Sequence, residues 1–448
     1  MRVRLKHLLA WCGPCLPISA LGLPLVVYLP PHYAGTLGLP LATVGFIFAF
    51  VRIIDIPIDP LLGAWMDGTR SRIGQFRPWI LGGGFVLAAG VWLLFMARPG
   101  VTATMAFLSL LLLYIGWSMV YLAQTAWGSR LSPDYTERTR IFGFWTAANA
   151  FATLLVLLIP PAIAFFGLAG GPSSSVHAMG WFVLALIPLT VAAAITLVPE
   201  GEAAGPQHRI RFADVRRVMA DRRMQLLLLG DLLLSVVPGI TGALFLFFFT
   251  AARAIPAGTA SALLLGYFLA GLLAAPLWVK GASRFGKHRM AALAGFWLGA
   301  AQLGVWAIPE GAIALTALAF LLAGAPISAP PFLLRAMLAD LTDAQELDRR
   351  RSGDMAADTT GLNYALLTAT QKLGYAIPVG LTYPILGLIG FDPTPGASNG
   401  PSAIAGLTAL YVGPPFLLGA LAAWLIWRWP ITAEVHARIR AELQETQP

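Results

Sequence analysis

Charged residues are scarce in this 448-residue chain, at 11% of the sequence, whereas hydrophobic residues make up 58%. Soluble globular proteins average about 25% charged and about 45–50% apolar residues. Because a soluble core cannot bury such an excess of apolar side chains, the composition excludes an ordinary soluble protein. We predict an all-α protein whose main partner is the lipid bilayer.

Cysteine and the usual sequence patterns of enzyme sites are also scarce. The only two cysteines lie in Trp11-Cys12-Gly13-Pro14-Cys15, which is the active-site sequence of thioredoxins. The redox site of thioredoxins follows a β-strand, and no β-strand is predicted before this motif. Gly13 and Pro14 instead predict a kink in a membrane helix. The six histidines show no pair at metal-binding spacing, and no glycine-rich phosphate loop follows a strand. We therefore expect neither an enzyme nor an ATP-driven pump, and no cofactor or resident metal. A membrane thiol oxidoreductase that uses Cys12 and Cys15 is the alternative of a different class.

Long apolar stretches, in contrast, are abundant. About 18 to 25 apolar residues suffice for a helix to cross a hydrocarbon core of about 30 Å. The sequence predicts twelve such spans, at about residues 8–32, 41–65, 78–97, 103–127, 141–166, 178–198, 225–252, 258–279, 290–308, 312–336, 361–391 and 403–429.

The basic residues are strongly segregated along the chain. Nearly all of the 30 Lys and Arg lie in the two termini and in every second loop between the predicted spans. Under the positive-inside rule, this pattern places both termini in the cytoplasm of a multi-pass protein of the cytoplasmic membrane. The net charge of +9 therefore reports topology, and no nucleic-acid partner is expected.

A hydrophilic stretch at residues 199–224 divides the chain into two predicted six-helix bundles, at residues 1–198 and 225–448. Within this stretch Phe212, Val215, Val218 and Met219 lie on one side of a short basic helix, which is typical of a segment on the inner membrane surface. We expect a cytoplasmic linker.

Short repeated sequences suggest that the two bundles are related. Ser71–Arg77 reads Ser-Arg-Ile-Gly-Gln-Phe-Arg and Ser283–Arg289 reads Ser-Arg-Phe-Gly-Lys-His-Arg, with four of seven positions identical. Asp134–Glu137 reads Asp-Tyr-Thr-Glu and Asp343–Glu346 reads Asp-Ala-Gln-Glu, so the second pair of loops shares its first and last residues. Parallel repeats of this kind hold a substrate between the two halves near the membrane midplane. Alternatively, short cytoplasmic loops select Ser, Gly and Arg in any case.

The second predicted span contains Arg52, Asp55 and Asp59, spaced three and four residues apart and therefore on one helix face. Each charge at the bilayer centre costs about 2.5–3.5 kcal/mol on insertion scales. A proton or a hard cation such as sodium would relieve the repulsion between the two carboxylates. Pro57 and Pro60 also leave backbone carbonyls without their usual donors. We predict a cation site at Asp55 and Asp59. The alternative is a static ion pair between Arg52 and Asp55.

Two further charges lie inside predicted spans, Asp231 in the seventh and Lys372 in the eleventh. Together with Arg52, these are predicted to line the cavity and to couple ion and substrate. Asp231 could alternatively reach interfacial water, and Lys372 could extend to the membrane surface.

The residues around the acidic motif also carry a family resemblance. Asp55–Gly63 reads Asp-Ile-Pro-Ile-Asp-Pro-Leu-Leu-Gly, and Asp67–Trp79 reads Asp-Gly-Thr-Arg-Ser-Arg-Ile-Gly-Gln-Phe-Arg-Pro-Trp. This pattern resembles the signature of the glycoside-pentoside-hexuronide:cation symporters, the family of melibiose permease. Weaker echoes occur at Leu131–Arg140, Ala339–Asp343 and Gln371–Gly374.

The resemblance implies a twelve-helix major-facilitator fold of two pseudo-symmetric six-helix bundles. It further implies that Asp55 and Asp59 bind the cation, that Lys372 lines the cavity, and that the chain is a symporter of a sugar or glycoside with sodium or a proton. We expect such a carrier to work as a monomer.

The sugar-binding residues of melibiose-type members are poorly matched. Where those members have acidic residues, this chain has Ser19 and a position near Tyr121. Where they have an arginine, it has Trp145 and Thr146. The predicted substrate contacts are Ser19, Tyr121, Gln124, Thr125, Trp145, Asn149 and Tyr364. Each of these could equally be an ordinary interhelical residue. Because the sugar groups are depleted, a cation-coupled carrier of an amphipathic solute such as a lysophospholipid is the nearest alternative.

Charged residues in the basic loops form a predicted cytoplasmic gate. Its members are Asp67, Arg72, Asp343 and Arg349. The alternative is a solvated loop, because a surface ion pair contributes only about 0–1 kcal/mol.

Overall fold

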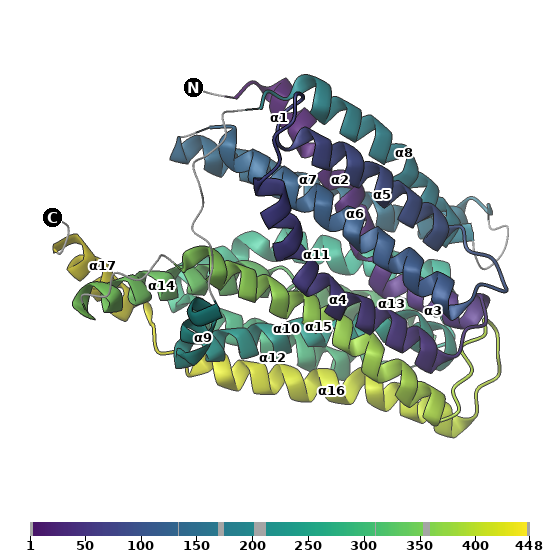
Figure 1. Ribbon diagram of the computed structural model, residues 1–448. Coiled ribbons are helices and arrows are strands. Elements are labelled where there is room, and N and C mark those ends of the chain that lie inside the picture. Colours follow the sequence, from purple (N-terminus) through teal and green to yellow (C-terminus); the bar gives the residue numbers. More distant parts are fainter. Residues whose placement is uncertain are drawn as a thin grey trace. The chain divides into compact units, whose positions relative to one another are not determined.

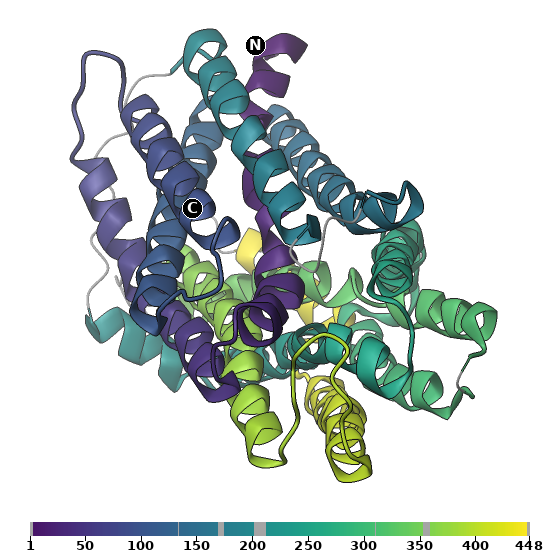
Figure 2. The ribbon, with the colours of Figure 1, turned by 90° about the vertical axis from the view of Figure 1, so that its right-hand side faces the viewer.

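The computed structural model describes residues 3–132, 134–168, 174–200, 212–309, 311–352 and 359–445, and within these ranges all regular secondary structure is helical. Figures 1 and 2 show the helices from two directions. Most of the long helices coincide with predicted spans. The helices are α1 (Leu5–Cys12), α2 (Cys15–Gly22), η1 (Pro24–Tyr28), α3 (Leu29–Pro31), η2 (His32–Thr36), α4 (Leu41–Asp67), α5 (Arg77–Phe95), α6 (Ala103–Arg130), α7 (Tyr135–Phe165), α8 (Ser174–Leu197), α9 (Phe212–Ala220), α10 (Arg222–Phe247), η3 (Phe248–Ala252), α11 (Ala257–Phe285), α12 (Lys287–Ala307), α13 (Ile313–Gly324), α14 (Ala329–Ser352), α15 (Thr360–Leu388), α16 (Pro401–Trp427) and α17 (Ala433–Glu445).

Eleven helical stretches in the described part of the chain are long and apolar enough to cross a membrane. They match the predicted spans except the one at 361–391. At residues 361–391 the helix α15 has 29 residues, which is about 43 Å at 1.5 Å per residue and long enough to cross a membrane. Polar residues such as Lys372 lower its mean hydropathy. The twelfth span and the cytoplasmic placement of the termini stay predictions.

The first span is broken at the predicted kink. Helix α1 ends at Cys12 and α2 begins at Cys15, with Gly13 and Pro14 between them. Both cysteines are buried free thiols. The neighbouring Trp11 is fully buried, and its indole N–H donates to the backbone carbonyl of Gln124 at 3.1 Å. This stretch therefore packs α1 against α6.

The chain forms two compact units. Unit 1 comprises residues 1–205, 242–265 and 379–407, and unit 2 comprises residues 206–241, 266–378 and 408–448. The helices α10, α11, α15 and α16 each contribute to both units. The predicted division at 199–224 into two six-helix bundles remains a prediction.

Unit 1 is built on the close pair α5 and α6, with α4 against α6, α2 against α7, and α1 and α5 against α8. The purple first span runs among these blue helices in both views (Figures 1 and 2). A Cβ on Gly90 would lie 2.6 Å from the Leu113 backbone, and one on Gly116 would lie 2.4 Å from the Leu87 nitrogen. Glycine at these two positions lets the backbones of α5 and α6 approach, as small residues do in membrane helix pairs.

Unit 2 has its core among α10, α12 and α14, where Leu234, Ala291, Leu334 and Leu338 are buried together. Val218 of α9 joins this core and Val215 packs against it, so these two residues of the predicted apolar side pack on unit 2, whereas Met219 is 40% exposed. The C-terminal tail, predicted only as a short cytoplasmic segment, contains the helix α17, which contacts α14.

The two repeated loops share a backbone feature. Gly74 and Gly286 occupy the same position in the seven-residue repeats, and their φ angles are 117° and 93°. Only glycine adopts such angles without strain, so the shared glycine has a conformational cause. The second echo has no such basis, because Asp134 caps the N-terminus of α7 and Asp343 lies inside α14.

Candidate functional site

Asp55 lies at the centre of a buried polar cluster in unit 1. Its side chain is 1% exposed. One carboxylate oxygen, Oδ2, lies 3.4 Å from Nη1 of Arg52, one helical turn earlier in α4. The other, Oδ1, accepts a hydrogen bond of 3.2 Å from the Ser118 hydroxyl of α6. The spacing of Arg52 and Asp55 thus produces the contact that the static-pair alternative requires, and the cation site at Asp55 and Asp59 stays a prediction.

Arg52 is itself held by an aromatic ring. Its guanidinium carbon lies 4.0 Å from the centre of the Tyr114 ring in α6. A cation stacked on an aromatic face gains about 0.5–2 kcal/mol, depending on how far it is desolvated. The arginine is therefore supported from two sides, by the Asp55 carboxylate and by the face of Tyr114.

Asp59 is half-buried on the next turn of α4. The helix continues through Pro57 and Pro60 to Asp67. Neither proline has an N–H to donate to the carbonyl one turn earlier. Oxygen atoms from carboxylates and unpaired carbonyls are the ligands preferred by hard cations, so this segment of α4 concentrates the right donor atoms.

Ser118 is the residue of this cluster that the sequence analysis missed. It lies in α6, 63 positions after Asp55, and no motif marks it. Small polar residues in apolar spans are common at interhelical contacts. The sequence therefore does not show that Ser118 bonds Asp55, because this contact depends on how α4 packs against α6.

Four of the predicted substrate residues gather in unit 1, on α2, α6 and α7. The Ser19 hydroxyl donates to Oδ1 of Asn149. The rings of Tyr121 and Trp145 lie 5.9 Å apart. All four are half-buried, and the indole nitrogen of Trp145 is buried without a hydrogen-bond partner among the described residues. We call Ser19, Tyr121, Trp145 and Asn149 the polar-aromatic cluster.

Two other predicted substrate residues make contacts within the helices. Gln124 is fully buried, and its amide nitrogen donates to the Trp11 carbonyl at 2.7 Å. The Thr125 hydroxyl bonds the carbonyls of Tyr121 and Leu122 in its own helix. Gln124 thus ties α6 to α1, which is the interhelical role considered from the sequence.

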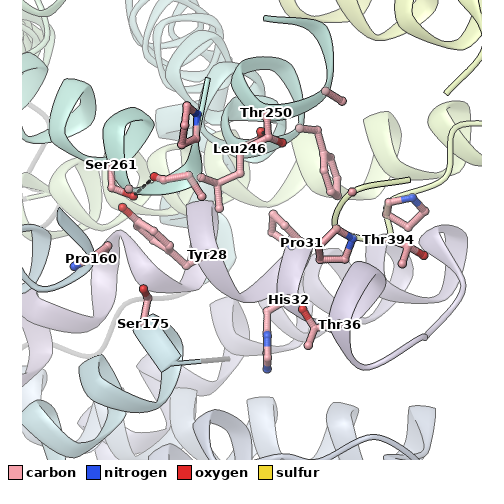
Figure 3. A pocket seen from close by; sticks show the side chains of 18 of the residues that line it. Tyr28, Pro31, His32, Thr36, Pro160, Ser175, Leu246, Thr250, Ser261 and Thr394 are labelled. Atoms are coloured by element: carbon pink, nitrogen blue, oxygen red, sulfur yellow. Dashed lines mark hydrogen bonds between the residues drawn. The ribbon is translucent and has the colours of Figure 1, made fainter. Parts of the chain in front are cut away.

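A cavity of about 740 Å³ lies elsewhere in unit 1, at the ends of α7 and α10 and beside the loop between α15 and α16. The residues that line it include Tyr28, His32, Thr250 and Ser261, which the sequence analysis did not single out. Figure 3 shows Tyr28 pointing toward Ser261, and His32 pointing away from them. None of the predicted substrate residues is in its lining.

The loop at the rim of this cavity is held by its own side chains. The amide N–H of Thr394 donates to Oδ1 of Asp392 at 2.9 Å, and this bond together with the Thr394 hydroxyl holds the pKa of Asp392 below its usual range. The Asn399 side chain bonds both the amide and the carbonyl of Asp392.

The remaining predicted charges belong to unit 2. Asp231 of α10 is 1% exposed, and Thr370 and Gln371 of α15 hydrogen-bond its carboxyl group. Lys372, the next residue of α15, is half-buried, and Tyr364 is 36% exposed at the beginning of the same helix. Asp231 is therefore buried among side chains and does not reach interfacial water by itself.

The predicted gate residues make separate contacts. Asp343 Oδ2 lies 2.9 Å from Nε2 of His436 in α17, whereas Arg349 pairs with Glu346. Arg72 is exposed in its loop, and the side chain of Asp67 lies outside the described residues.

The loop after α4 is fixed by a residue that was not predicted. Glu200 accepts the backbone N–H groups of Gln75 and Phe76, at 2.5 and 2.6 Å. In unit 2 the corresponding loop is fixed by Lys287, which lies 2.7 Å from Oδ1 of Asp340.

Comparisons with known proteins agree with this architecture. The chain is 25% identical to the "Uncharacterized symporter YjmB" of Bacillus subtilis over 94% of this chain and 91% of that protein. It is 26% identical to the "Raffinose carrier protein" of Pediococcus pentosaceus over 90% of this chain and 64% of that protein. The structure of the nucleoside transporter NupG matches with a TM-score of 0.69 at 14% identity, covering 95% of this chain and all of that chain.

A family profile gives the assignment. The profile described as "MFS/sugar transport protein" matches residues 12–433, nearly the whole chain. Together with the helical structure and the eleven candidate spans, this match makes the protein a multi-pass membrane transporter and not an enzyme, as the sequence predicted. The chain belongs to the MFS/sugar transport protein family.

Proposed function

We propose that this protein carries a sugar or glycoside across the cytoplasmic membrane together with a cation, sodium or a proton, by alternating access. The observation that carries the proposal is the cluster of half-buried Arg52 with buried Asp55 and Ser118, which joins two candidate spans. Intramembrane carboxylates are costly and are mostly kept for ion or substrate handling.

The proposed cation site combines Asp55, Asp59 and the Ser118 hydroxyl. In this proposal the cation takes over part of the role of Arg52 at the Asp55 carboxylate. Binding can drive transport only if the cation prefers one conformation over another. A site in which the carboxylate has an alternative positive partner, Arg52, offers such a difference, because the ion pair and the bound cation compete for the same oxygen atoms.

The proposed sugar contacts are those of the polar-aromatic cluster. An aromatic face can stack on a sugar ring, and the free indole N–H of Trp145 can donate to a hydroxyl. Relatives named for sugars support the class of cargo: a raffinose carrier, a lactose permease and an isoprimeverose transporter.

The test is uptake of labelled raffinose, lactose and isoprimeverose into proteoliposomes under an imposed sodium or proton gradient. We expect at least one sugar to accumulate under one gradient, and Asp55→Asn and Asp59→Asn to lose that accumulation. The matched control is Glu434→Gln, the same acid-to-amide change at an exposed position of α17. Undiminished accumulation in both aspartate variants would refute the cation site.

The sugar contacts are tested separately by exchange of labelled sugar without any gradient. We expect Trp145→Phe, which keeps an aromatic ring and removes the N–H, to weaken apparent sugar affinity by about tenfold, the effect of losing one buried hydrogen bond. If no sugar is exchanged while lysophospholipid is, the cargo is amphipathic and the sugar proposal is wrong.

A further inference from the structure

A second buried carboxyl group, Asp231, lies in unit 2 and has no part in the cation site proposed above. It lies in α10, within the candidate span Arg222–Ala252. It is as completely buried as Asp55, with 1% of its surface exposed. An ionised carboxylate at such a place must be paired or must lose its charge.

The hydrogen-bond partners of Asp231 are both neutral. Thr370 Oγ1 lies 2.6 Å from Oδ2, and the amide nitrogen of Gln371 donates to Oδ1 at 3.2 Å. Among the described residues no ion pair involving Asp231 is found. Two neutral donors compensate poorly for burying a full negative charge.

The protons available to this cluster can be counted. Thr370 Oγ1 also lies 2.8 Å from the carbonyl oxygen of Leu367. A hydroxyl carries one proton, and Oγ1 of Thr370 lies within hydrogen-bond distance of both oxygen atoms. If the threonine proton serves the Leu367 carbonyl, the 2.6 Å contact requires a proton on Asp231, which then donates to the threonine oxygen. With Asp231 as a neutral carboxylic acid, the threonine proton serves the Leu367 carbonyl and the acid proton serves the threonine oxygen, so each close contact has a proton of its own.

Other charged and titratable groups surround the cluster at longer range. Nη2 of Arg335 in α14 donates to Oε1 of Gln371 at 3.3 Å, so the amide of Gln371 links the guanidinium to Asp231. The phenol of Tyr375 interacts electrostatically with Asp231 from α15, and Lys372 follows Gln371 in that helix. Arg335 is thus positioned to stabilise a negative charge on Asp231 through one intervening amide.

We propose that Asp231 is a proton-binding site of unit 2, distinct from the cation site of unit 1. In the described state the proton is on Asp231. On release its O–H bond breaks and the proton passes to a water molecule. The carboxylate that remains keeps the amide N–H of Gln371, and the Thr370 hydroxyl turns from Leu367 to donate to it. The chain then binds a proton independently of the cation at Asp55.

Infrared spectroscopy of the purified full-length protein tests this site without any substrate. A protonated carboxyl group has a carbonyl stretch that separates from the amide bands and shifts in heavy water. We expect such a band at neutral pH in the wild type, its loss in Asp231→Asn, and no change in Glu434→Gln. A band that persists unchanged in Asp231→Asn would overturn the proposal.

A second variant covers the case in which Asp231→Asn does not fold. Thr370→Val keeps the shape of the side chain and removes the hydroxyl group. We expect the carbonyl band to move to higher frequency in Thr370→Val, because the acid loses its hydrogen-bond acceptor. A purely structural role of Thr370 would leave the frequency unmoved, and that result would also contradict the proposal.

Discussion

Asp55 and Asp231 are buried to the same extent, at 1% exposure, yet their surroundings differ in kind. Asp55 has a guanidinium group at 3.4 Å and a hydroxyl group at 3.2 Å. Asp231 has a hydroxyl group and an amide, with Arg335 reached only through Gln371. Burial alone favours the neutral acid in both places, whereas a nearby cation favours the carboxylate. The comparison therefore sets Asp55, which has a guanidinium group beside it, against Asp231, whose hydrogen-bond partners are neutral and to which we assign a proton.

The largest effect is expected at Asp55. Asp55→Asn leaves the half-buried Arg52 beside a neutral amide, and breaking a buried ion pair costs about 3–5 kcal/mol. We expect a clear fall in the thermal unfolding midpoint of Asp55→Asn in detergent. The double variant Arg52→Gln/Asp55→Asn should recover most of that stability without regaining gradient-driven uptake. An unfolding midpoint of Asp55→Asn equal to that of the wild type would mean that the pair is not charged.

A smaller effect is expected when the neutral partner of Asp55 is removed. Ser118→Ala takes away one hydrogen bond to a charged group and should cost about 1.5–3 kcal/mol. Ser118→Thr keeps the hydroxyl group and serves as the control. Cation affinity, measured by the sodium or proton concentration that gives half-maximal uptake, should weaken in the alanine variant and not in the threonine variant. Equal affinities in both would remove Ser118 from the site.

A carboxylate outside the spans gives an intermediate reference point. Burial acts to raise the pKa of Asp221, but hydrogen bonds from Arg223 and Gln345 outweigh it and hold this pKa below its usual range. A lowered folded-state pKa stabilises the fold above the unfolded pKa, and this stabilisation is lost as pH falls through the folded value. We expect Asp221→Asn to cost about 1 kcal/mol at neutral pH, with the difference from wild type shrinking below about pH 4. A difference that grows in acid would contradict this sign.

The smallest effect is expected at Asp231. Asp231→Asn replaces a neutral acid with a neutral amide of the same shape, so its unfolding free energy should stay within about 1 kcal/mol of the wild type. The measurement is the one used for Asp55→Asn, which makes the two changes directly comparable. If Asp231→Asn costs as much as Asp55→Asn, Asp231 is ionised and the contrast between the two carboxyl groups fails.

The features that could be predicted from the sequence are those that depend on residue spacing within one helix. The i, i+3 relation of Arg52 and Asp55 predicted their contact because a helix fixes it, and apolar run lengths predicted most spans. The kink at Gly13 and Pro14 followed from backbone chemistry in the same way. Each of these features is decided within one turn or one helix.

Contacts between distant helices were beyond the sequence. Ser118 meets Asp55 across 63 positions, and Thr370 meets Asp231 across 139, and such pairings depend on which helix faces pack together. The substrate residues were predicted as one set, but Gln124 ties α6 to α1 while Ser19 and Asn149 meet across α2 and α7. The charge of Asp231 could be noticed from the sequence, but its neutral partners could not.

The most direct test of the central claim is to follow the cation itself. Proteoliposomes without any imposed gradient are given a transported sugar on one side, and internal sodium and internal pH are recorded as the sugar enters. The wild type is expected to bring one of the two cations in with the sugar, and Asp55→Asn is expected to move no cation. Sugar entry in the wild type without movement of sodium or protons would contradict the account.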